Sequence, residues 1–226
     1  MKVIEETLLV LKPDAVVRRF VSVEALKILL SKSLATTAFK EMLVSTELAK
    51  KHYAVHEGKP FYDWLIRFIT SAPVIAMRVQ GEDVIKEIRT ILGSTFAHKA
   101  EPETLRGKYG IYGGINVAHA SDSKETSAEE LGLWEKDAKL TKESSKAVIK
   151  RMNEYIKRYS PDNTPDHTKE LRNTCLGIVD RKISEENGRS TLTKLLDSEF
   201  LKADRKYLKA FSETVIETCL MDRNKN

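Results

Sequence analysis

The sequence predicts an α+β fold, in which a ferredoxin-like antiparallel sheet carries helices on one face and an all-α C-terminal extension follows it. Three observations support this prediction. Short β-rich apolar runs alternate with segments of helical periodicity through the first 120 or so residues. One helical segment separates the first two strands, and one separates the last two. Beyond residue 134 the sequence shows helical periodicity alone.

The first unit reads as β-α-β. Residues 7–11 form an apolar strand pattern that ends at Lys12-Pro13-Asp14, because proline cannot continue a central strand. Residues 21–34 have apolar side chains at helical spacing, and residues 35–44 return to a strand pattern rich in threonine. A lysine, Lys12, is therefore expected at a strand end.

The middle of the chain continues this alternation. Ser45-Thr46-Glu47 predicts a helix start that runs into His52 and Tyr53, and a second short helix is predicted over residues 61–69. A strand over 74–79 and a helix over 82–92 come next. No sustained periodicity appears from residue 93 to 114, and ordered loops of this length usually have a function.

A histidine follows the last predicted strand, residues 115–118. His119 opens into Ala120, Ser121, Asp122 and Ser123, and a helix should begin next, with Ser121 or Ser123 as its cap. Neighbouring hydroxyl and carboxyl groups are the conditions for an activated imidazole. The alternative is a partly buried histidine that caps a turn.

Three cations, Lys12, Arg89 and Arg106, fall at or near the ends of predicted elements. The fold could bring them to the same rim as His119. Cations converging on a histidine suit phosphate, because guanidinium groups pair with phosphate oxygens and stabilise charge during transfer. Taken singly, each cation could equally be a solvated surface residue.

Composition points to a globular, cytoplasmic protein. The chain has 226 residues with 41% hydrophobic content, and no apolar run approaches the length of a membrane span. The stretch before residue 7 is expected to be too short for a secretory signal. The two cysteines, Cys175 and Cys219, lie in apolar helical patterns, which favours buried thiols over disulfides, and we identify no metal-ligand spacing.

The basic excess is concentrated at the C-terminal end. The net charge is +5, and residues 135–226 hold 20 Lys and Arg against 16 Asp and Glu. These charges are intermixed along helical patterns, which favours solvated helix faces. A surface for nucleic acid or for an acidic partner is the alternative.

Residues 135–226 are predicted to form three amphipathic helices. The first covers about 147–159, the second begins at Pro165 and ends at Asn187-Gly188, and a long third one runs from a cap at Ser190 to about 216. Their apolar stripes must be buried, so we expect this extension to dock within the assembly. We divide the chain into residues 1–134 and a helical extension, 135–226, of unassigned function.

Several motifs occur together in the order and spacing of one family. On these motifs the chain resembles nucleoside diphosphate kinase across residues 5–134. They are Thr7 to Val16 (TLLVLKPDAV), His52-Tyr53 with Lys59-Pro60-Phe61-Tyr62, Ser71 to Met77 (SAPVIAM), Thr104-Leu105-Arg106-Gly107, and Asn116 to Ser123 (NVAHASDS).

The resemblance implies a ping-pong reaction, in which His119 takes the terminal phosphate of a nucleoside triphosphate such as ATP and passes it to a nucleoside diphosphate. It also implies that magnesium arrives with the nucleotide, with no metal site of the protein's own, and that the protein is a homo-oligomer. The implied catalytic residues are His119, Lys12, Ser121 and Glu130. The implied nucleotide-binding residues are Lys12, Tyr53, Phe61, Arg89, Thr95, Arg106 and Asn116, with Phe61 stacked on the base.

Four departures from the family pattern stand out. Ile115 replaces an arginine found in many members, and Ala120 replaces the glycine after the histidine. Phe96-Ala97 replaces Asn-Pro in a loop that helps the family's subunits associate, and Arg18-Arg19-Phe20 lacks the glycine after the first arginine. Neither Ile115 nor Ala120 removes a reacting group. The competing hypothesis is a kinase-like scaffold or binding protein whose helical tail recruits a partner.

Overall fold

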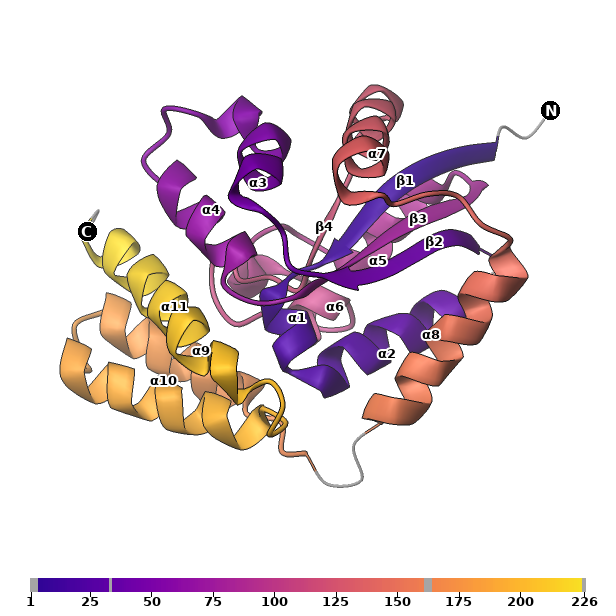
Figure 1. The fold of residues 1–226 in the computed structure, drawn as a ribbon. Coiled ribbons are helices and arrows are strands. Elements are labelled where there is room, and N and C mark those ends of the chain that lie inside the picture. The colour runs from indigo at the N-terminus through magenta and orange to yellow at the C-terminus, as the bar shows by residue number, and fades with distance from the viewer. Residues whose placement is uncertain (1–3, 33, 161–163, 225–226) are drawn as a thin grey trace.

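The protein folds around an antiparallel sheet. The computed structural model describes residues 4–32, 34–160 and 164–224. Within them, β1 (Ile4–Leu11), β2 (Ala35–Met42), β3 (Val74–Glu82) and β4 (Ala118–Ala120) form a four-stranded sheet in the order β2-β3-β1-β4, with every neighbouring pair antiparallel (Figure 1). The predicted α+β class is confirmed.

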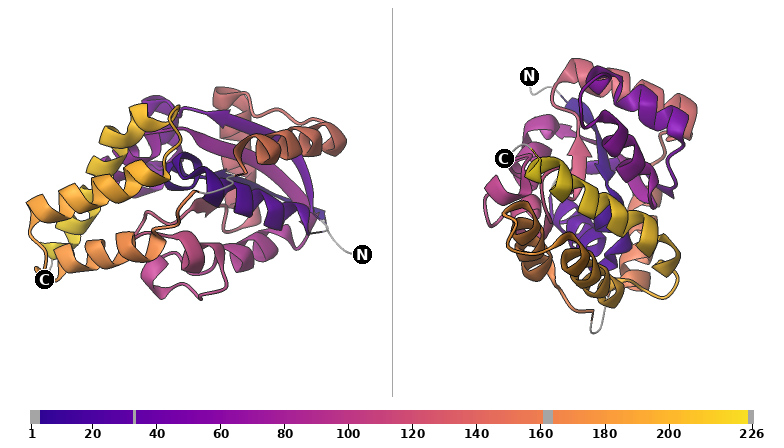
Figure 2. Two further views of the ribbon diagram at one scale, coloured as in Figure 1. Left: turned by 90° about the horizontal axis from the view of Figure 1, so that it is seen from below. Right: turned by 90° about the vertical axis from the view of Figure 1, so that its left-hand side faces the viewer.

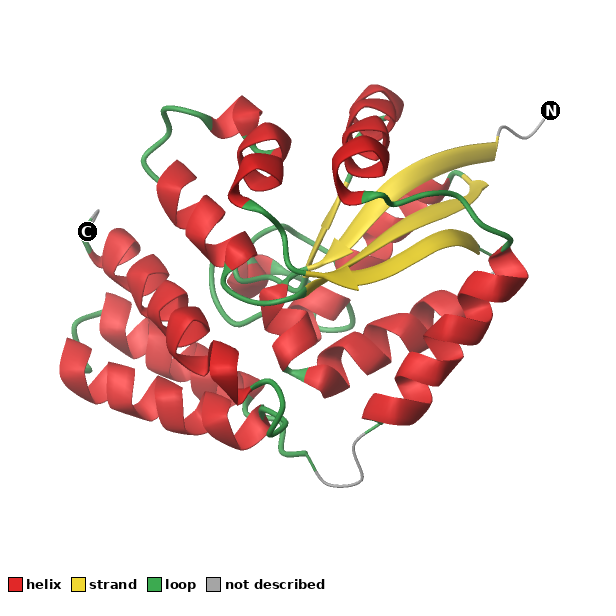
Figure 3. Ribbon diagram, in the orientation of Figure 1, coloured by secondary structure: helices red, strands yellow, loops and turns green. Residues whose placement is uncertain are grey.

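Helices make up most of the remaining structure (Figure 3). In the part before residue 139 they are α1 (Pro13–Val17), α2 (Arg19–Leu30), α3 (Thr46–His52), α4 (Tyr62–Thr70), α5 (Val84–Leu92), α6 (Leu105–Tyr109) and α7 (Lys124–Ala138). They continue with α8 (Ser145–Tyr159), α9 (Thr168–Val179), α10 (Glu185–Glu199) and α11 (Leu208–Arg223). Short 3-10 turns occur at Ala54–His56, Ala97–Lys99 and Arg205–Tyr207.

Serine caps set the start of several helices. The hydroxyl of Ser45 accepts a hydrogen bond from the Leu48 amide at 3.1 Å, and that of Ser123 accepts one from the Thr126 amide at 3.1 Å. These bonds satisfy amides that have no partner within the helix. Ser45 lies in a helix start expected from the sequence, and Ser123 is one of the two caps, Ser121 or Ser123, that the sequence offered for α7.

The last strand differs from the prediction. The structure starts β4 at Ala118, so His119 lies within the strand instead of after it. Val117 has φ of 75°, a left-handed conformation that a β-branched residue rarely adopts. Its amide donates to Asp14 Oδ2 at 2.7 Å and its carbonyl accepts from the Lys12 amide at 2.8 Å. These two hydrogen bonds hold the backbone in a kink at Val117, so the strand begins only at Ala118.

Helices cover the sheet on both faces. On one face Leu9 and Leu11 of β1 pack against α2 and α5, the predicted layer. On the other face Leu8 and Val10 pack in a core that includes α3, α4 and α7, which the sequence analysis did not place there (Figure 1). The alternation along β1 therefore serves two cores, because successive side chains of a strand point to opposite sides.

The C-terminal extension docks on the rest of the chain in two places. Helix α8 lies along β2 and α2, where the rings of Tyr155 and Phe39 meet edge to face with centroids 6.0 Å apart. Helices α9, α10 and α11 pack on one another, and α11 lies along α4 (Figure 2). The expectation that the apolar stripes are buried is confirmed. The division of the chain at residue 134 stays a prediction, and α7 continues past it to Ala138.

The helix boundaries predicted for the extension are partly wrong. The predicted long third helix is two helices, α10 and α11, and Ser184 caps α10 in place of Ser190. Asn187-Gly188, expected to end a helix, lies inside α10. A Cβ atom on Gly188 would lie 2.5 Å from Ile178 Cδ1, so this glycine lets α10 approach α9. Its role is close packing, which sequence periodicity does not reveal.

Two buried arginines join the extension to the sheet domain. Arg18 has no exposed side-chain surface and donates to Glu199 at 2.6 Å and to the Thr168 hydroxyl at 2.6 Å. Arg19 donates to both carboxylate oxygens of Asp204, at 2.7 and 2.8 Å. Arg19, which stands where the family pattern has a glycine, thus supplies a second cation that pairs with the extension. Bidentate pairs of this kind fix orientation as well as contributing energy.

We predict that Glu199→Ala lowers the free energy of unfolding by about 3–5 kcal/mol, because it removes the closer and fully buried of the two carboxylates that pair with the Arg18 guanidinium. Lys194→Ala, an exposed position on the same helix, should change it by less than about 0.5 kcal/mol. Urea unfolding followed by circular dichroism measures both. Equal midpoints for the two variants would contradict the importance of the pair.

Candidate active site

Three predicted catalytic residues meet at the end of the sheet. His119 Nε2 lies 2.9 Å from Glu130 Oε1, and the Ser121 hydroxyl donates to Glu130 Oε2 at 2.6 Å. His119 and Ser121 come from β4 and the residue after it, and Glu130 comes from α7. The His119 side chain is 24% exposed, so it is reachable from solvent while its partner is mostly covered.

The Glu130 carboxylate decides which nitrogen of His119 is available. Burial by itself would raise the pKa of Glu130, but the hydrogen bond and charge of His119 outweigh it and hold that pKa below its usual value. Glu130 is therefore ionised at neutral pH and accepts a hydrogen bond from the Nε2–H group of His119. We assign the Nε2–H tautomer on this basis, which leaves the lone pair of a neutral imidazole on Nδ1.

His52 belongs to this group, although the sequence analysis did not include it among the site residues. Its ring meets that of His119 edge to face, with centroids 4.6 Å apart, and its Nδ1 accepts from Trp134 Nε1 at 3.3 Å. Burial first, and then the charge of His119, lower the pKa of His52 to about 3. Its 3.8 Å approach to Glu130 is consequently not an ion pair. Only the motif His52-Tyr53 signalled it in the sequence.

Lys12 and Asn116 form a second group. The Lys12 ammonium nitrogen donates to Asn116 Oδ1 at 2.8 Å and to the Gly114 carbonyl at 3.3 Å. Burial, followed by the nearby charge of Arg106, lowers the pKa of Lys12 to about 7. Asn116 in turn donates to the Thr95 carbonyl at 2.6 Å. Three predicted nucleotide-binding residues are thus connected by hydrogen bonds.

Arg106 connects this second group to β4. Its guanidinium donates to three carbonyls, those of Gly93 at 2.8 Å, Ala118 at 2.8 Å and Asn116 at 3.2 Å. Burial and then the charge of Arg89 lower the pKa of Arg106 to about 10. The hydrogen-bond acceptors of this cation are neutral carbonyls, an arrangement that favours a bound anion.

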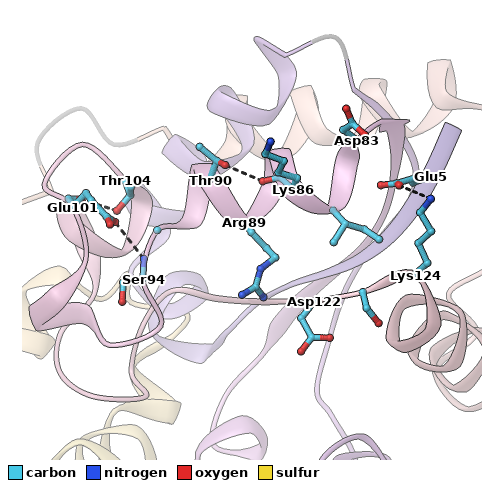
Figure 4. A pocket seen from close by; sticks show the side chains of 13 residues that line it. Glu5, Asp83, Lys86, Arg89, Thr90, Ser94, Glu101, Thr104, Asp122 and Lys124 are labelled. Carbon is cyan, nitrogen blue, oxygen red and sulfur yellow. Dashed lines mark hydrogen bonds and ion pairs between the residues drawn. The ribbon is translucent and has the colours of Figure 1, made fainter. Parts of the chain in front are cut away.

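The remaining predicted residues lie around these two groups. Arg89 is exposed on α5 and lines a hollow of about 750 Å³, where its side chain points toward Asp122 (Figure 4). The Tyr53 ring is buried 6.5 Å from the His119 ring, and burial raises the pKa of its hydroxyl. Phe61 is partly buried and faces His56, with ring centroids 5.5 Å apart. Phe61 therefore stands at the periphery, beyond His56.

The group around His119 also contains side chains of the kinds that bind metal ions. Ligand atoms of His52, His119 and Glu130 all lie within 4.8 Å of one another, the one such grouping in the described ranges of the chain. Both Glu130 oxygens accept hydrogen bonds, and His52 Nδ1 accepts one from Trp134. Glu130 is therefore fully engaged within the protein, whereas His52 Nε2 is buried without a hydrogen-bond partner among the described residues.

Comparison with known proteins identifies the class. The family model described as nucleoside diphosphate kinase matches residues 5–140. A nucleoside diphosphate kinase of Staphylococcus epidermidis is 50% identical over 130 residues, which cover 58% of this chain and 87% of the relative. One from Microcystis aeruginosa is 47% identical over 136 residues, covering 60% and 91%.

Solved structures agree with the sequence matches. A halophilic nucleoside diphosphate kinase from Halobacterium salinarum, in complex with CDP, is 39% identical with a TM-score of 0.57, covering 62% of this chain and 93% of its own. The Aquifex aeolicus nucleoside diphosphate kinase is 32% identical with a TM-score of 0.57, covering 62% and 100%.

The fold and these matches define a phosphotransferase that acts on nucleotides. The chain belongs to the nucleoside diphosphate kinase family. The resemblance found in the sequence is confirmed, and the match ends at residue 140, before α8 begins. Among the described helices, none is both long enough and apolar enough to cross a bilayer.

The lowered pKa of Lys12 generates a prediction about pH. The unfolded chain, with a usual lysine pKa of 10.5, binds a proton between pH 7 and 10.5 that the folded chain does not bind. The contribution of Lys12 to the free energy of unfolding therefore rises with pH in this window, by up to about 1.4 kcal/mol per pH unit.

We expect the unfolding free energy of the unmodified protein to rise relative to Lys12→Met between pH 7 and pH 9.5. Lys27→Met, an exposed position on α2, serves as the matched control and should follow the unmodified protein. Urea titrations at each pH give the three curves. Parallel curves for the unmodified protein and Lys12→Met would show that Lys12 keeps an ordinary pKa in the fold.

Proposed function

We propose that this chain transfers the terminal phosphate of a nucleoside triphosphate to a nucleoside diphosphate by a ping-pong mechanism, with a phosphohistidine on His119 Nδ1 as the intermediate. The contact that carries the proposal is the 2.9 Å approach of Glu130 to His119 Nε2. It separates the two ring nitrogens by role. Nε2 keeps its proton, and Nδ1 keeps the lone pair that a nucleophile needs.

In the first half of the reaction, Nδ1 forms a bond to the γ-phosphorus. The bond from that phosphorus to the oxygen bridging it to the β-phosphate breaks, and the nucleoside diphosphate leaves with the electron pair. The imidazole becomes cationic, and the Glu130 carboxylate, itself held by Ser121, stabilises the charge. A terminal phosphate oxygen of the acceptor then attacks the same phosphorus, and Nδ1 leaves.

Lys12, Arg89 and Arg106 are the proposed cations for the phosphates, helped by Tyr53 and Thr95. Preorganised charge of this kind stabilises the transferring group without reorganisation during the reaction. A phosphate bound beside Lys12 would raise its pKa from about 7 and so restore the ammonium charge when substrate is present.

Asn116 completes the proposed phosphate and ribose contacts, and Phe61 is the proposed stacking surface for the base. Stacking accepts any base, because every base has a π face. Base tolerance follows from this part of the proposal.

Magnesium is proposed to come with the nucleotide, bridging its phosphates and neutralising part of their charge. The donor set fits this arrangement, since Glu130 is engaged by His119 and Ser121. Burial raises the pKa of a second nearby carboxyl, Asp14, which makes it a poor cation ligand. The chain's residues would therefore hold the phosphates, and the phosphates would hold the ion.

Family membership also supports a cytoplasmic homo-oligomer, which we include in the proposal. The competing hypothesis is a kinase-like scaffold whose tail recruits a protein or a nucleic acid. Lys12, Arg106 and Asn116 are bonded into one network next to the strand that carries His119. A scaffold would have no chemical need for this arrangement, which favours the enzyme.

We predict that ATP labelled in its γ-phosphate, with magnesium, labels the unmodified protein and that GDP discharges the label to GTP. His119→Ala should abolish both steps, because it removes the nucleophile. His167→Ala, at the start of α9, is the matched control and should behave normally. A phosphoenzyme formed by His119→Ala and discharged by GDP would rule the mechanism out.

We predict that Arg106→Ala retains the fold and loses transfer by roughly 10²-fold or more, as expected when one preorganised charge stabiliser is removed. Arg158→Ala, an exposed arginine on α8, is the control. Steady-state exchange between ATP and GDP gives the rates, and circular dichroism verifies folding. Near-normal turnover of Arg106→Ala would take this residue out of the site.

A further inference from the structure

The segment from α6 to β4, residues 105–117, carries much of the proposed site. Arg106 lies in α6, the Gly114 carbonyl accepts from Lys12, and Asn116 pairs with Lys12. Yet this segment has little regular structure, with a five-residue helix and an isolated bridge between Tyr112 and Ile115. So short a helix leaves carbonyls at its C-terminal end that need partners from outside.

Arginines from elsewhere supply those partners. Arg172, on α9, donates from Nη2 to the Gly110 carbonyl at 2.6 Å and to the Gly107 carbonyl at 3.1 Å, and from Nε to Gly110 at 3.3 Å. Arg18 donates to the Tyr109 carbonyl at 2.9 Å. Cations are favoured at the carbonyl end of a helix, where they complement its dipole. The carbonyl end of α6 is therefore held by two guanidinium groups.

The position of Arg172 is electrostatically unfavourable, because its positive charge is partly buried and lies near that of Arg18. Burial, and then the charge of Arg18, lower the pKa of Arg172. Two cations are placed side by side because the carbonyls of one turn need both of them. Glu199 beside Arg18 compensates part of this charge and also comes from the extension.

Helix α11 reaches the same segment from another side. Trp64 on α4 donates to the Thr214 carbonyl of α11 at 2.8 Å. The indole ring of Trp64 packs against Gly114, where an added Cβ atom would lie 3.0 Å from the ring. Tyr112 donates to Asp222, near the end of α11, at 3.2 Å. The extension thus touches the segment through α9 and through α11.

We propose that α9 and α11 brace the segment 105–117, and that Arg172 is a positioning residue for phosphoryl transfer. Arg172 acts through the carbonyls of Gly107 and Gly110, and so through the placement of Arg106 and of the Lys12–Asn116 pair. The inference rests on the proposed function, since these are the groups that would bind the phosphates. Small displacements of positioning groups lower rates strongly, because the reacting atoms must be held in near-attack geometry.

The test measures how fast His119 is phosphorylated in a single turnover at saturating ATP and magnesium, together with the ATP concentration at half saturation. We expect Arg172→Ala to slow the saturated rate roughly tenfold or more. Arg172→Lys should recover part of the loss, because an ammonium group can still donate to the Gly110 carbonyl. The matched control is Arg189→Ala, whose half-buried arginine pairs with Glu185 and Glu213 inside the extension. It should keep the rate of the unmodified protein.

Thermal melting of each variant separates positioning from stability, and rates are compared well below every midpoint. A normal saturated rate for Arg172→Ala, with or without a lowered melting temperature, would overturn the proposal. If Arg172→Ala does not fold, Arg172→Lys and Tyr112→Phe carry the same expectation of a slower rate, and normal rates in both would overturn it. A failure of the proposed function would look different, because the unmodified protein itself would not label His119.

Discussion

The guanidinium group of Arg18 has no exposed surface, so its N–H groups must find acceptors inside the protein. It finds them in Glu199 of α10, the Thr168 hydroxyl of α9 and the Tyr109 carbonyl of α6. One buried cation therefore requires the C-terminal helices and the α6 segment to be in place at the same time. Removing an acceptor would leave a buried charge uncompensated, and this is why the extension is part of the fold.

The proposed site brings three cations, Lys12, Arg89 and Arg106, close together. Burial, followed by the charge of a neighbouring arginine, lowers the pKa values of Lys12 and Arg106, whereas the Glu130 carboxylate is committed to His119 and Ser121. Such an arrangement is costly in the unliganded protein and favours a bound polyanion. His52 contributes by remaining neutral beside His119, which leaves the Glu130 charge available to the reacting ring.

Sequence reasoning located most of the proposed site, because the residues proposed to carry the chemistry lie in local motifs. His119, Ser121 and Glu130 could be assigned through the resemblance, and the structure brings them within hydrogen-bond reach. Sequence reasoning did not place His52 in the group, because the contacts of His52 to His119 and Trp134 join residues far apart in the chain. The start of β4 was missed for a related reason, since the hydrogen bond that the Val117 amide donates to the distant Asp14 carboxylate holds Val117 in its kink.

The sequence by itself determined the α+β class, the family and the identity of the proposed nucleophile, because periodicity and motif spacing are properties of neighbouring residues. Only the tertiary structure decided what the extension contacts. Arg18 and Arg172 look like ordinary surface cations in the sequence, and their acceptors are the carboxylate of Glu199, the Thr168 hydroxyl and backbone carbonyls. Every residue carries a backbone carbonyl, so no residue pattern marks which one will be left without a partner in the fold. The link between the extension and the site is therefore visible in three dimensions alone.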